Sequence, residues 1–340
     1  MDALLTESFE RLLQGACSPA VVREIERSLV AGKLWAELEA SGYADLLLPG
    51  EGRAGLRDAF ALWLACGAEA LPLPLAQTMW ARGLLGPQAP AGPIALAASV
   101  RRDAEGRLHC AGVPFGAVAA SLLLTTPEGE GRCVSLADAQ VQRSGVHGSL
   151  QADILLPPQP AGAVPLPART DLQAAGALIT AALMAGALQR VLTMTLRYAN
   201  DRAQFGKPIG KFQAVQQQLA VLAEQAFAAR MAAELACADR AVTPQRLRAA
   251  LAKARAADAA DKAVAIAHAV QGAIGVTAEF DLQLLTRRLQ EWRGDHGSAS
   301  YWHAELGRAL VAAKGRATLP FLLETLLPDA AARPEDGTHE

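Results

Sequence analysis

The stretch YANDRAQFGKPIGKFQAV, residues 198–215, decides the fold of this chain. It ends a long alanine-rich helical pattern over 171–200 and opens a second helical pattern over 212–240. Between them the glycine- and proline-containing segment 205–210 predicts a tight turn. An ordinary helical bundle needs apolar residues three and four positions apart, but it does not need Phe-Gly-Lys-Pro-Ile-Gly in a connection. The stretch is therefore more specific than helical periodicity alone.

The rest of the C-terminal half predicts more helices of the same kind. Thr170 or Asp171 can cap the first helix, and Thr243-Pro244 provides an N-cap and first-turn pair for another. Four long helices with short connections predict a bundle, and the polar tail from Pro328 is expected to fray. The predicted helices cover residues 171–200, 212–240, 244–271, 279–293 and 299–314.

The first half of the chain has a different character. Its beginning predicts helices, and the middle contains short apolar runs that are broken by Gly, Asp and Pro and predict strands. The predicted fold is mainly α with a small central β domain. Helices are expected over 19–43, 56–69 and 76–85, strands over 94–97, 107–113, 121–126 and 133–136, and an extended linker over 156–167. The expected domains are 1–90 (helical), 91–165 (small β), 166–330 (four-helix bundle) and a tail at 331–340.

Composition excludes several classes of function. A formal net charge of -2 offers no electrostatic case for nucleic acid or an anionic membrane surface. The N-terminus MDALLTESFE lacks the pattern of a signal peptide, and the apolar run 174–188 is too short to span a bilayer. Five scattered cysteines without metal-ligand spacing are expected to be reduced core thiols of a cytoplasmic protein, so we expect no metal site. They are Cys17, Cys66, Cys110, Cys133 and Cys237.

Residues 198–215 resemble the signature of the acyl-CoA dehydrogenase family, where a helix ends in an Arg-x-Gln-Phe-Gly-Lys-Pro-Ile turn and the next begins with Phe-Gln-Ala-Val-Gln. The motifs that carry the resemblance lie in the C-terminal half. The order of the predicted elements also agrees with the family over most of the chain. It implies an N-terminal helical domain, a β-barrel-like middle domain and a C-terminal four-helix bundle. It also implies FAD as cofactor and α,β-dehydrogenation of an acyl-CoA thioester, with a Glu carboxylate taking the α-proton while the β-hydrogen leaves as hydride to the flavin.

The same resemblance assigns cofactor-binding residues. In the family this turn reaches across a dimer interface to the flavin of the partner subunit. Carried over, Arg202 pairs with the flavin diphosphate, because a guanidinium matches phosphate oxygens, and Gln204 and Phe205 lie beside the cofactor. Without the resemblance, Asp201 and Arg202 are ordinary solvated charges at a helix end.

A second flavin element of the family, Gln-x-x-Gly-Gly-x-Gly, corresponds to residues 269–275. Gly272 and Gly275 match, while Ala269 replaces the Gln and Ala273 replaces the second Gly. The backbone N–H of Ala273 can still contact phosphate, although the side-chain amide is lost. A plain helix C-cap at Gly272 is the alternative. The flavin-binding loops of the family's middle domain are not found in this sequence.

The catalytic Glu of the family is missing here. Counting forward without a gap from the Ile-Gly-x-Thr-x-Glu run at 274–279, the family's Glu-Gly-Thr/Ser triplet falls on residues 296–298, His-Gly-Ser. Some members carry the Glu on an earlier bundle helix, and that position falls close to Gly176. Neither position holds an acid.

Three interpretations of this absence are open. His296 can be the base, since neutral imidazole has a suitable pKa. Asp295 or Glu291 can supply the carboxylate through a local shift of register. Alternatively, the subunit has no base, and the segment is a solvated turn with Ser298 as N-cap.

The remaining predictions concern substrate and partners. Arg287 is a candidate for steering an anionic substrate, or else it or Arg288 is an ion-pair partner of Asp281 or Glu291, and Trp292 can line an acyl pocket. Arg202 acts only across an interface, which predicts a homodimer or a dimer of dimers, with electron-transfer flavoprotein as the redox partner of an active enzyme. Besides an active dehydrogenase, the resemblance allows a base-lacking subunit that pairs with a Glu-bearing paralogue, or a scaffold that has lost flavin.

Overall fold

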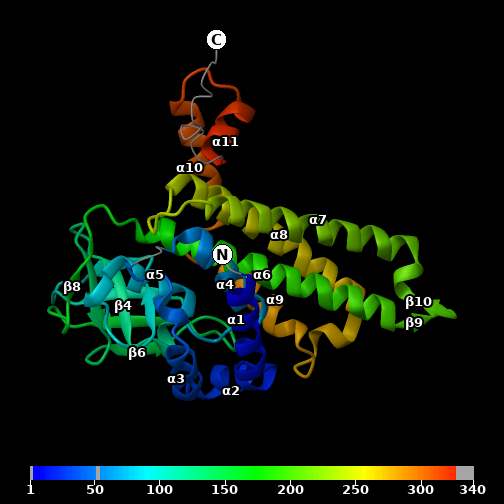
Figure 1. Ribbon diagram of the computed structural model, residues 1–340, viewed down its shortest axis with the longest axis horizontal. Helices are drawn as coiled ribbons and strands as arrows, with labels where there is room; N and C mark the ends of the chain where they lie inside the picture. The colour runs from blue at the N-terminus through cyan, green and yellow to red at the C-terminus, as the bar shows by residue number, and fades with distance from the viewer. Residues whose placement is uncertain (1–2, 51–53, 327–340) are drawn as a thin grey trace, which may run out of the picture.

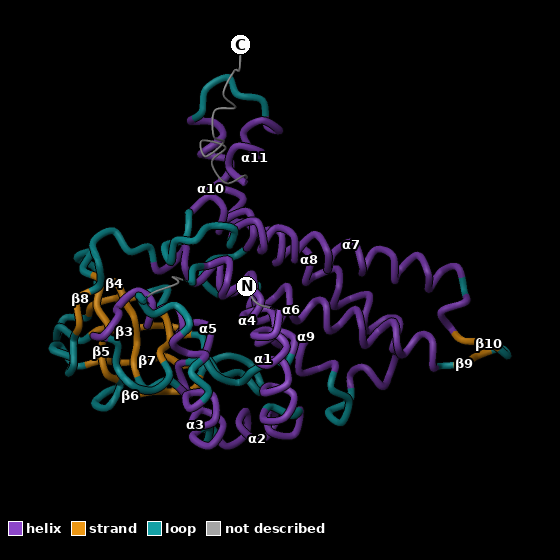
Figure 2. Tube along the Cα trace, in the orientation of Figure 1, coloured by secondary structure: helices purple, strands orange, loops and turns teal. Residues whose placement is uncertain are grey.

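The chain folds as three successive groups of elements (Figures 1 and 2). The computed structural model describes residues 3–50 and 54–326. The first group is helical: α1 (Ala3–Ala16), α2 (Pro19–Ser28), α3 (Gly32–Ala40), α4 (Leu56–Ala68) and α5 (Leu75–Leu85). The second contains the strands β1 (Ile94–Leu96), β2 (Val100–Arg102), β3 (Leu108–Val113), β4 (Ser121–Thr125), β5 (Gly131–Ser135), β6 (Gln140–Arg143), β7 (Ala152–Leu156) and β8 (Val164–Pro165).

The third group is helical again and contains the longest elements of the chain. It comprises α6 (Leu172–Asp201), the short strands β9 (Ala203–Gln204) and β10 (Lys207–Pro208), α7 (Gln213–Ala236), α8 (Arg246–Gln271), α9 (Leu282–Trp292), α10 (Ala299–Ala312) and α11 (Thr318–Leu326). A mainly helical chain with a small sheet region and C-terminal helices confirms the predicted fold class.

The sheet region consists of two four-stranded sheets, in the orders β1-β4-β5-β8 and β2-β3-β7-β6. Only β1 and β4 pair in parallel, and the other described pairs in these sheets are antiparallel. The two sheets share a core of their own, which includes Val113, Leu122 and Ile154. Four strands, β2, β6, β7 and β8, lie outside the predicted strand runs. Most residues of β2 and β6 face solvent, whereas β7 was missed although Ala152, Ile154 and Leu156 are buried, and β8 falls within the predicted extended linker.

The single helix predicted over 19–43 is wrong, because the chain breaks at Leu29. Leu29 adopts a left-handed conformation with φ 59°, and its N–H closes onto the carbonyl of Ile25 as the C-cap of α2. The break gives α2 and α3 separate axes, so that Ile25 and Leu38 both reach the core. Helical spacing of apolar residues is preserved on both sides of such a break, so the pattern alone did not reveal it.

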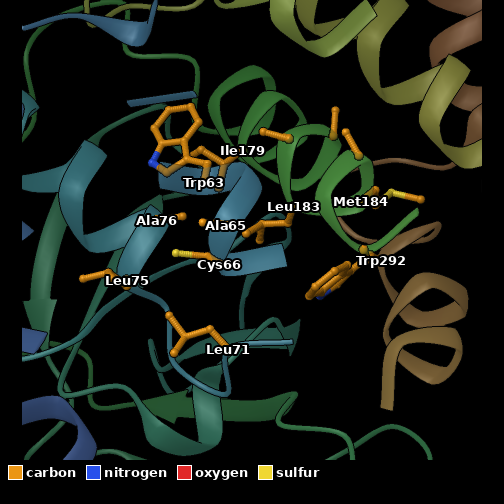
Figure 3. Close-up of a cluster of buried hydrophobic side chains, with 14 of the residues drawn as sticks. Trp63, Ala65, Cys66, Leu71, Leu75, Ala76, Ile179, Leu183, Met184 and Trp292 are labelled. Atoms are coloured by element: carbon orange, nitrogen blue, oxygen red, sulfur yellow. The ribbon is translucent and has the colours of Figure 1, made fainter. Parts of the chain in front are cut away.

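Helix α6 is the central element, since it packs against α4, α7, α8 and α9. Figure 3 shows Trp63 and Cys66 from α4 beside Ile179 and Leu183 from α6 in this core. The helices α4 and α6 approach closely at glycines: a Cβ on Gly186 would lie 1.9 Å from the carbonyl oxygen of Leu64. By length and composition α6 passes as a membrane span, but 89% of its most apolar window is buried inside the protein, as in a core helix.

The helix caps test the sequence predictions at single residues. Asp171 caps α6 by accepting a hydrogen bond from the N–H of Ala174, and Ser298 caps α10 in the same way. The predicted cap pair Thr243-Pro244 is wrong, since the N-cap of α8 lies two residues later, at Gln245. All five cysteines are buried and free, as expected of core thiols. The predicted tail from Pro328 lies outside the described residues.

Candidate active site

A cavity of about 710 Å³ lies where loops of the sheet region meet α8, α9 and the turn after α9. Its sheet-region wall includes Ala98, Ala111, Pro114 and Gln151, and its helical wall includes Glu291, Asp295 and His296. A second cavity of about 900 Å³ adjoins it, because both are lined by Val146, His268 and Arg287. Both predicted catalytic residues, Asp295 and His296, are therefore brought together at one cavity.

The turn after α9 has an unusual backbone that is fixed from two sides. His296 is left-handed with φ 52°, and Gly297 follows with φ 107°. The indole Nε1 of Trp302 donates to the carbonyl of His296 at 3.1 Å, and there is no room for a Cβ at Gly297. From α8, the fully buried Lys253 donates to the carbonyls of Arg293 at 3.0 Å and Gly297 at 2.9 Å. The ammonium group thus holds both ends of the turn that carries Asp295 and His296.

The imidazole of His296 lies directly on Gly176. A Cβ built on Gly176 would lie 2.3 Å from both Cγ and Nδ1 of His296. The two positions predicted for the base, residue 296 and the neighbourhood of Gly176, therefore lie in contact, and a side chain at 176 and the ring at 296 exclude each other.

The electrostatics of His296 make it a weak base. Its side chain is only 2% exposed, and neither ring nitrogen has a hydrogen-bond partner among residues 3–50 and 54–326. Burial, with a smaller contribution from the charge of Lys253, lowers the pKa of His296 to about 3. The ring is therefore neutral at physiological pH and has little affinity for a proton.

The pKa of Asp295 is shifted in the direction that makes its side chain a stronger base. Burial is the main cause that raises the pKa of its carboxyl to about 8, and the nearby charge of Glu291 adds to the effect. Lys253 and a hydrogen bond from Gln151 work in the other direction. That bond runs from Nε2 of Gln151 to Oδ1 of Asp295 at 2.7 Å. A carboxyl with such a pKa both gains and loses a proton near neutrality, which suits a general base.

Arg287 lines both cavities, but its guanidinium is already engaged. It donates to Glu26 Oε2 at 2.8 Å, to the carbonyl of His147 at 2.6 Å and to Gln283 Oε1 at 2.6 Å. Arg288 reaches the other oxygen of the same Glu26 at 3.1 Å. The predicted ion pairs with Asp281 or Glu291 are therefore wrong.

The reason for that error is that the carboxylate comes from elsewhere in the chain. Glu26 lies on α2, far away in the sequence, while Asp281 pairs with Arg23 at 2.7 Å. The spacing of residues along α9 around Arg287 therefore could not reveal Glu26 as its partner. Trp292 is placed in the helical core beside Met184 (Figure 3), and it does not line either cavity.

The turn at residues 202–210 forms the hairpin β9–β10 at the end of the bundle opposite the sheet region (Figure 1). Phe205 at its tip is 91% exposed and left-handed, with φ 52°. Arg202 and Gln204 are also exposed, and Arg202 makes no ion pair within the described part of the chain. None of these three residues lines the two cavities.

The second predicted cofactor element follows α8. Gly272 caps that helix with φ 63°, Ala273 is exposed and Gly275 is buried. Gln271 does not replace the missing family Gln, because it is buried and its amide donates to Thr195 Oγ1 at 2.9 Å. Like the hairpin, the element lies outside both cavities.

Comparisons with known proteins agree with the sequence signature. Residues 173–298 match the family model described as acyl-CoA dehydrogenase, C-terminal domain. The acyl-CoA dehydrogenase IpdE2 of Mycolicibacterium smegmatis is 38% identical over 123 residues, which is 36% of this chain and 36% of that protein. FadE34 of Mycobacterium tuberculosis is 39% identical over 129 residues, 37% of this chain and 18% of that protein. The sequence matches thus span about a third or less of these relatives.

The fold comparison covers nearly the whole chain. The ChsE4-ChsE5 complex from Mycobacterium tuberculosis aligns with 92% of this chain and 97% of its own chain, with a TM-score of 0.77 and 24% sequence identity. This likeness concerns the fold, including the helical and sheet regions that precede the matched C-terminal domain. Together the comparisons support an acyl-CoA dehydrogenase family member: residues 173–298 match the C-terminal domain of that family, and the fold of nearly the whole chain resembles the solved structure.

The match to the acyl-CoA dehydrogenase C-terminal domain implies FAD as the cofactor, and the chemistry of the hairpin fits one end of that cofactor. The guanidinium of Arg202 is exposed and without an ion pair within 3–50 and 54–326, and Phe205 offers an exposed aromatic face. A cationic fork and an aromatic ring are the groups that a diphosphate and a ring system require. Ala273 is exposed, and a free backbone N–H is a donor of the kind that binds phosphate.

Two residues of the site, Gln151 and Lys253, were missed in the sequence. Gln151 precedes β7 in a stretch that carries no catalytic or binding motif, although Gly145 and Val146 line the same cavity. Lys253 did leave a signal, because it shares a helix face with the buried alanines Ala249, Ala256 and Ala260. A single lysine within an apolar stripe is a buried charge that needs specific partners.

Proposed function

We propose that this chain is a subunit of an FAD-dependent acyl-CoA dehydrogenase, which converts an acyl-CoA thioester into its α,β-unsaturated product. The flavin site in this proposal is completed between two chains. One observation carries it: the hairpin residues Arg202, Gln204 and Phe205 are exposed at the end of the bundle opposite the sheet region, while the cavity with Asp295 and His296 adjoins that region. A second chain, either another copy or a paralogue, has to bring such a hairpin to this cavity.

Each group of residues has a separate role. FAD, when bound, supplies the two-electron oxidation of the acyl chain. Arg202 holds the diphosphate through charge-assisted hydrogen bonds, and Phe205 packs against the cofactor. The cavity accepts the acyl group against Ala98, Ala111 and Pro114, which exclude water from the reacting carbons. Electron-transfer flavoprotein is the class of partner that reoxidises such an enzyme.

The first test is the visible absorbance spectrum of the purified protein, with the ratio of flavin to chain after incubation with excess FAD. We expect bound flavin in the assembled protein and its loss in Arg202→Ala. Arg197→Ala is the matched control, since Arg197 is an exposed arginine on the same helix whose only described ion pair is with Asp201. Flavin binding that is equal in both variants, or absent from every assembly, would contradict the proposal.

A second candidate is a base-lacking subunit that pairs with a Glu-bearing paralogue. The specific observation is that the neutral ring of His296 occupies the point where both base positions of the family meet. The ChsE4-ChsE5 complex is a precedent for paired chains of this fold.

Turnover separates the two candidates. A purified homo-oligomer that holds flavin but does not oxidise any acyl-CoA supports the base-lacking subunit, and His296→Glu should then create activity. Turnover by the homo-oligomer itself, with an artificial electron acceptor, would exclude that candidate. The scaffold alternative requires that no assembly bind flavin.

A further inference from the structure

Three side-chain contacts join the sheet region to α9 in a regular series. The carbonyl of His147 accepts from Arg287 at 2.6 Å, the hydroxyl of Ser149 donates to Glu291 at 2.5 Å, and the amide of Gln151 donates to Asp295 at 2.7 Å. On one side the residues are two apart, in the segment that leads from the turn at 146–149 into β7. On the other side they are four apart, along α9 and into the turn after it. Residues four apart share one face of a helix, so the segment runs along one face of α9.

The series ends at Asp295, where it fixes a carboxyl group at the cavity. The amide of Gln151 holds Oδ1, and Gln151 is itself fixed because its backbone N–H donates to Ser149 Oγ at 3.0 Å. Asp295 is 7% exposed and lines the cavity together with Gln151. The carboxyl is therefore anchored through one oxygen from the sheet region, while the residue remains in contact with the cavity.

The bundle fixes the same residue from behind. Lys253 donates to the carbonyls of Arg293 and Gly297, two residues before and two residues after Asp295. These two bonds tie the backbone on both sides of Asp295 to α8. His296, by contrast, has no hydrogen bond at either ring nitrogen within the described residues.

We propose that Asp295 is the residue that takes the α-proton of the thioester in this cavity, and that Gln151 and Lys253 are its positioning residues. The inference rests on the proposed function, because it presumes an acyl-CoA thioester in the cavity. The α C–H bond breaks, the proton passes to Asp295, and the electron pair stays on the α-carbon and delocalises into the thioester carbonyl. Returning a solvent-derived proton reverses the step, so the balance requires no oxidant.

Several charged groups surround Asp295 and set its titration. Glu291 and Arg288 face it from α9, Lys253 faces it from α8, and Gln151 faces it from the sheet region. Because the Gln151 bond stabilises the ionised carboxylate, its removal raises the pKa of Asp295. A general base must be ionised to act, so the acidic limb of the pH profile moves upward when the bond is lost.

The experiment measures exchange of the α-hydrogens of phenylacetyl-CoA for deuterium in D₂O by mass spectrometry. This thioester has α-hydrogens but no hydrogen on its β-carbon, so exchange is seen without oxidation or flavin turnover. We expect Asp295→Asn to lower the exchange rate at least about 100-fold. Gln151→Met should move the acidic limb upward by about one pH unit.

Gln290→Met is the matched control, since Gln290 also lines the cavity but bonds to Arg293 and not to Asp295. We expect its acidic limb to stay in place. Circular dichroism and the urea midpoint establish that each variant is folded, and isothermal titration establishes that it binds the thioester. An equal limb shift in both Met variants would show that Gln151 is merely structural.

Two results would overturn the assignment of the base. One is full exchange in Asp295→Asn together with loss in His296→Gln, and the other is no exchange by wild type that binds the thioester. The proposed function fails separately. Exchange that depends on Asp295 in a protein without flavin would uphold the inference and refute the dehydrogenase, whereas turnover that is independent of Asp295 would do the reverse.

Discussion

Replacing Gly176 by Ala tests the geometry of the site without relying on activity. The new Cβ would lie 2.3 Å from two atoms of the His296 ring and 2.5 Å from Cε1. Contacts below 3.0 Å between such atoms do not persist, so the ring has to move. The ring sits on a left-handed backbone that Trp302 and Lys253 hold in place, which limits how far it can yield.

Two opposing contributions decide whether Gly176→Ala raises or lowers the free energy of unfolding. Gly to Ala inside a helix stabilises by about 1 kcal/mol, because the unfolded chain loses less conformational freedom. Inserting a methyl group into a packed interior costs about 1–3 kcal/mol. We expect Gly176→Ala to lower the free energy of unfolding by about 0–2 kcal/mol. When His296 is first changed to Ala, the obstructing atoms are gone, and the same substitution should stabilise by about 1 kcal/mol.

Urea unfolding of the two single variants and the double variant gives the coupling energy between the two positions. We expect a coupling of about 1–3 kcal/mol. Gly186→Ala is the control on the same helix, because its Cβ would lie 1.9 Å from a backbone oxygen, that of Leu64, which His296→Ala does not remove. If the effects of Gly176→Ala and His296→Ala simply add, the ring does not lie on Gly176 and the convergence of the two base positions is refuted.

Three further predictions follow from single residues. Lys253→Met removes two hydrogen bonds from a buried ammonium and leaves two carbonyls without donors, so it should lower the free energy of unfolding by about 2–4 kcal/mol in urea, whereas exposed Lys262→Met should change it by less than about 0.5 kcal/mol. Phe205→Ser should leave the urea midpoint of the chain unchanged but weaken FAD binding measured by fluorescence titration, because the ring is 91% exposed and contributes little to the fold of one chain. Between pH 6.5 and the lowered pKa of His296 near 3, the folded chain binds fewer protons than the unfolded chain, so stability is lost as the pH falls through this window. His296→Gln should reduce that loss between pH 6.5 and 4.5 by about 2 kcal/mol in urea titrations, and an equal pH slope in both proteins would contradict the buried, neutral ring.

Local signals in the sequence were sufficient for the parts of the fold that depend on neighbours in the chain. The caps at Asp171 and Ser298 follow from side chains that bond within one turn, and the turn at 202–210 follows from Gly and Pro. The break at Leu29 could not be predicted in the same way, since a left-handed Leu is held by tertiary packing and not by its own preference. The partner of Arg287 was mispredicted for a related reason: Glu26 comes from a helix that is remote in sequence.

In the candidate site, too, some features could be predicted from neighbouring residues and others depend on remote parts of the chain. The positions of His296 and Gly176 came from counting along a family pattern, and the structure brings both residues into contact. The acid–base properties of the site residues could not be predicted by such counting. Burial sets the low pKa of His296 and the raised pKa of Asp295, and burial depends on α8 and the sheet region as much as on the turn itself.

Asp295 and His296 line the same cavity, but their surroundings differ. The ring at 296 is packed on Gly176 and carries no hydrogen bond at either nitrogen within residues 3–50 and 54–326, so its environment favours the neutral form. One residue earlier, the carboxyl of Asp295 is anchored by Gln151 and its turn by Lys253. A side chain that only fills space needs packing, whereas one that exchanges protons needs fixed polar partners, because its charge changes during the reaction. By this criterion the surroundings of Asp295 suit a group that exchanges protons, whereas those of His296 suit a side chain that fills space.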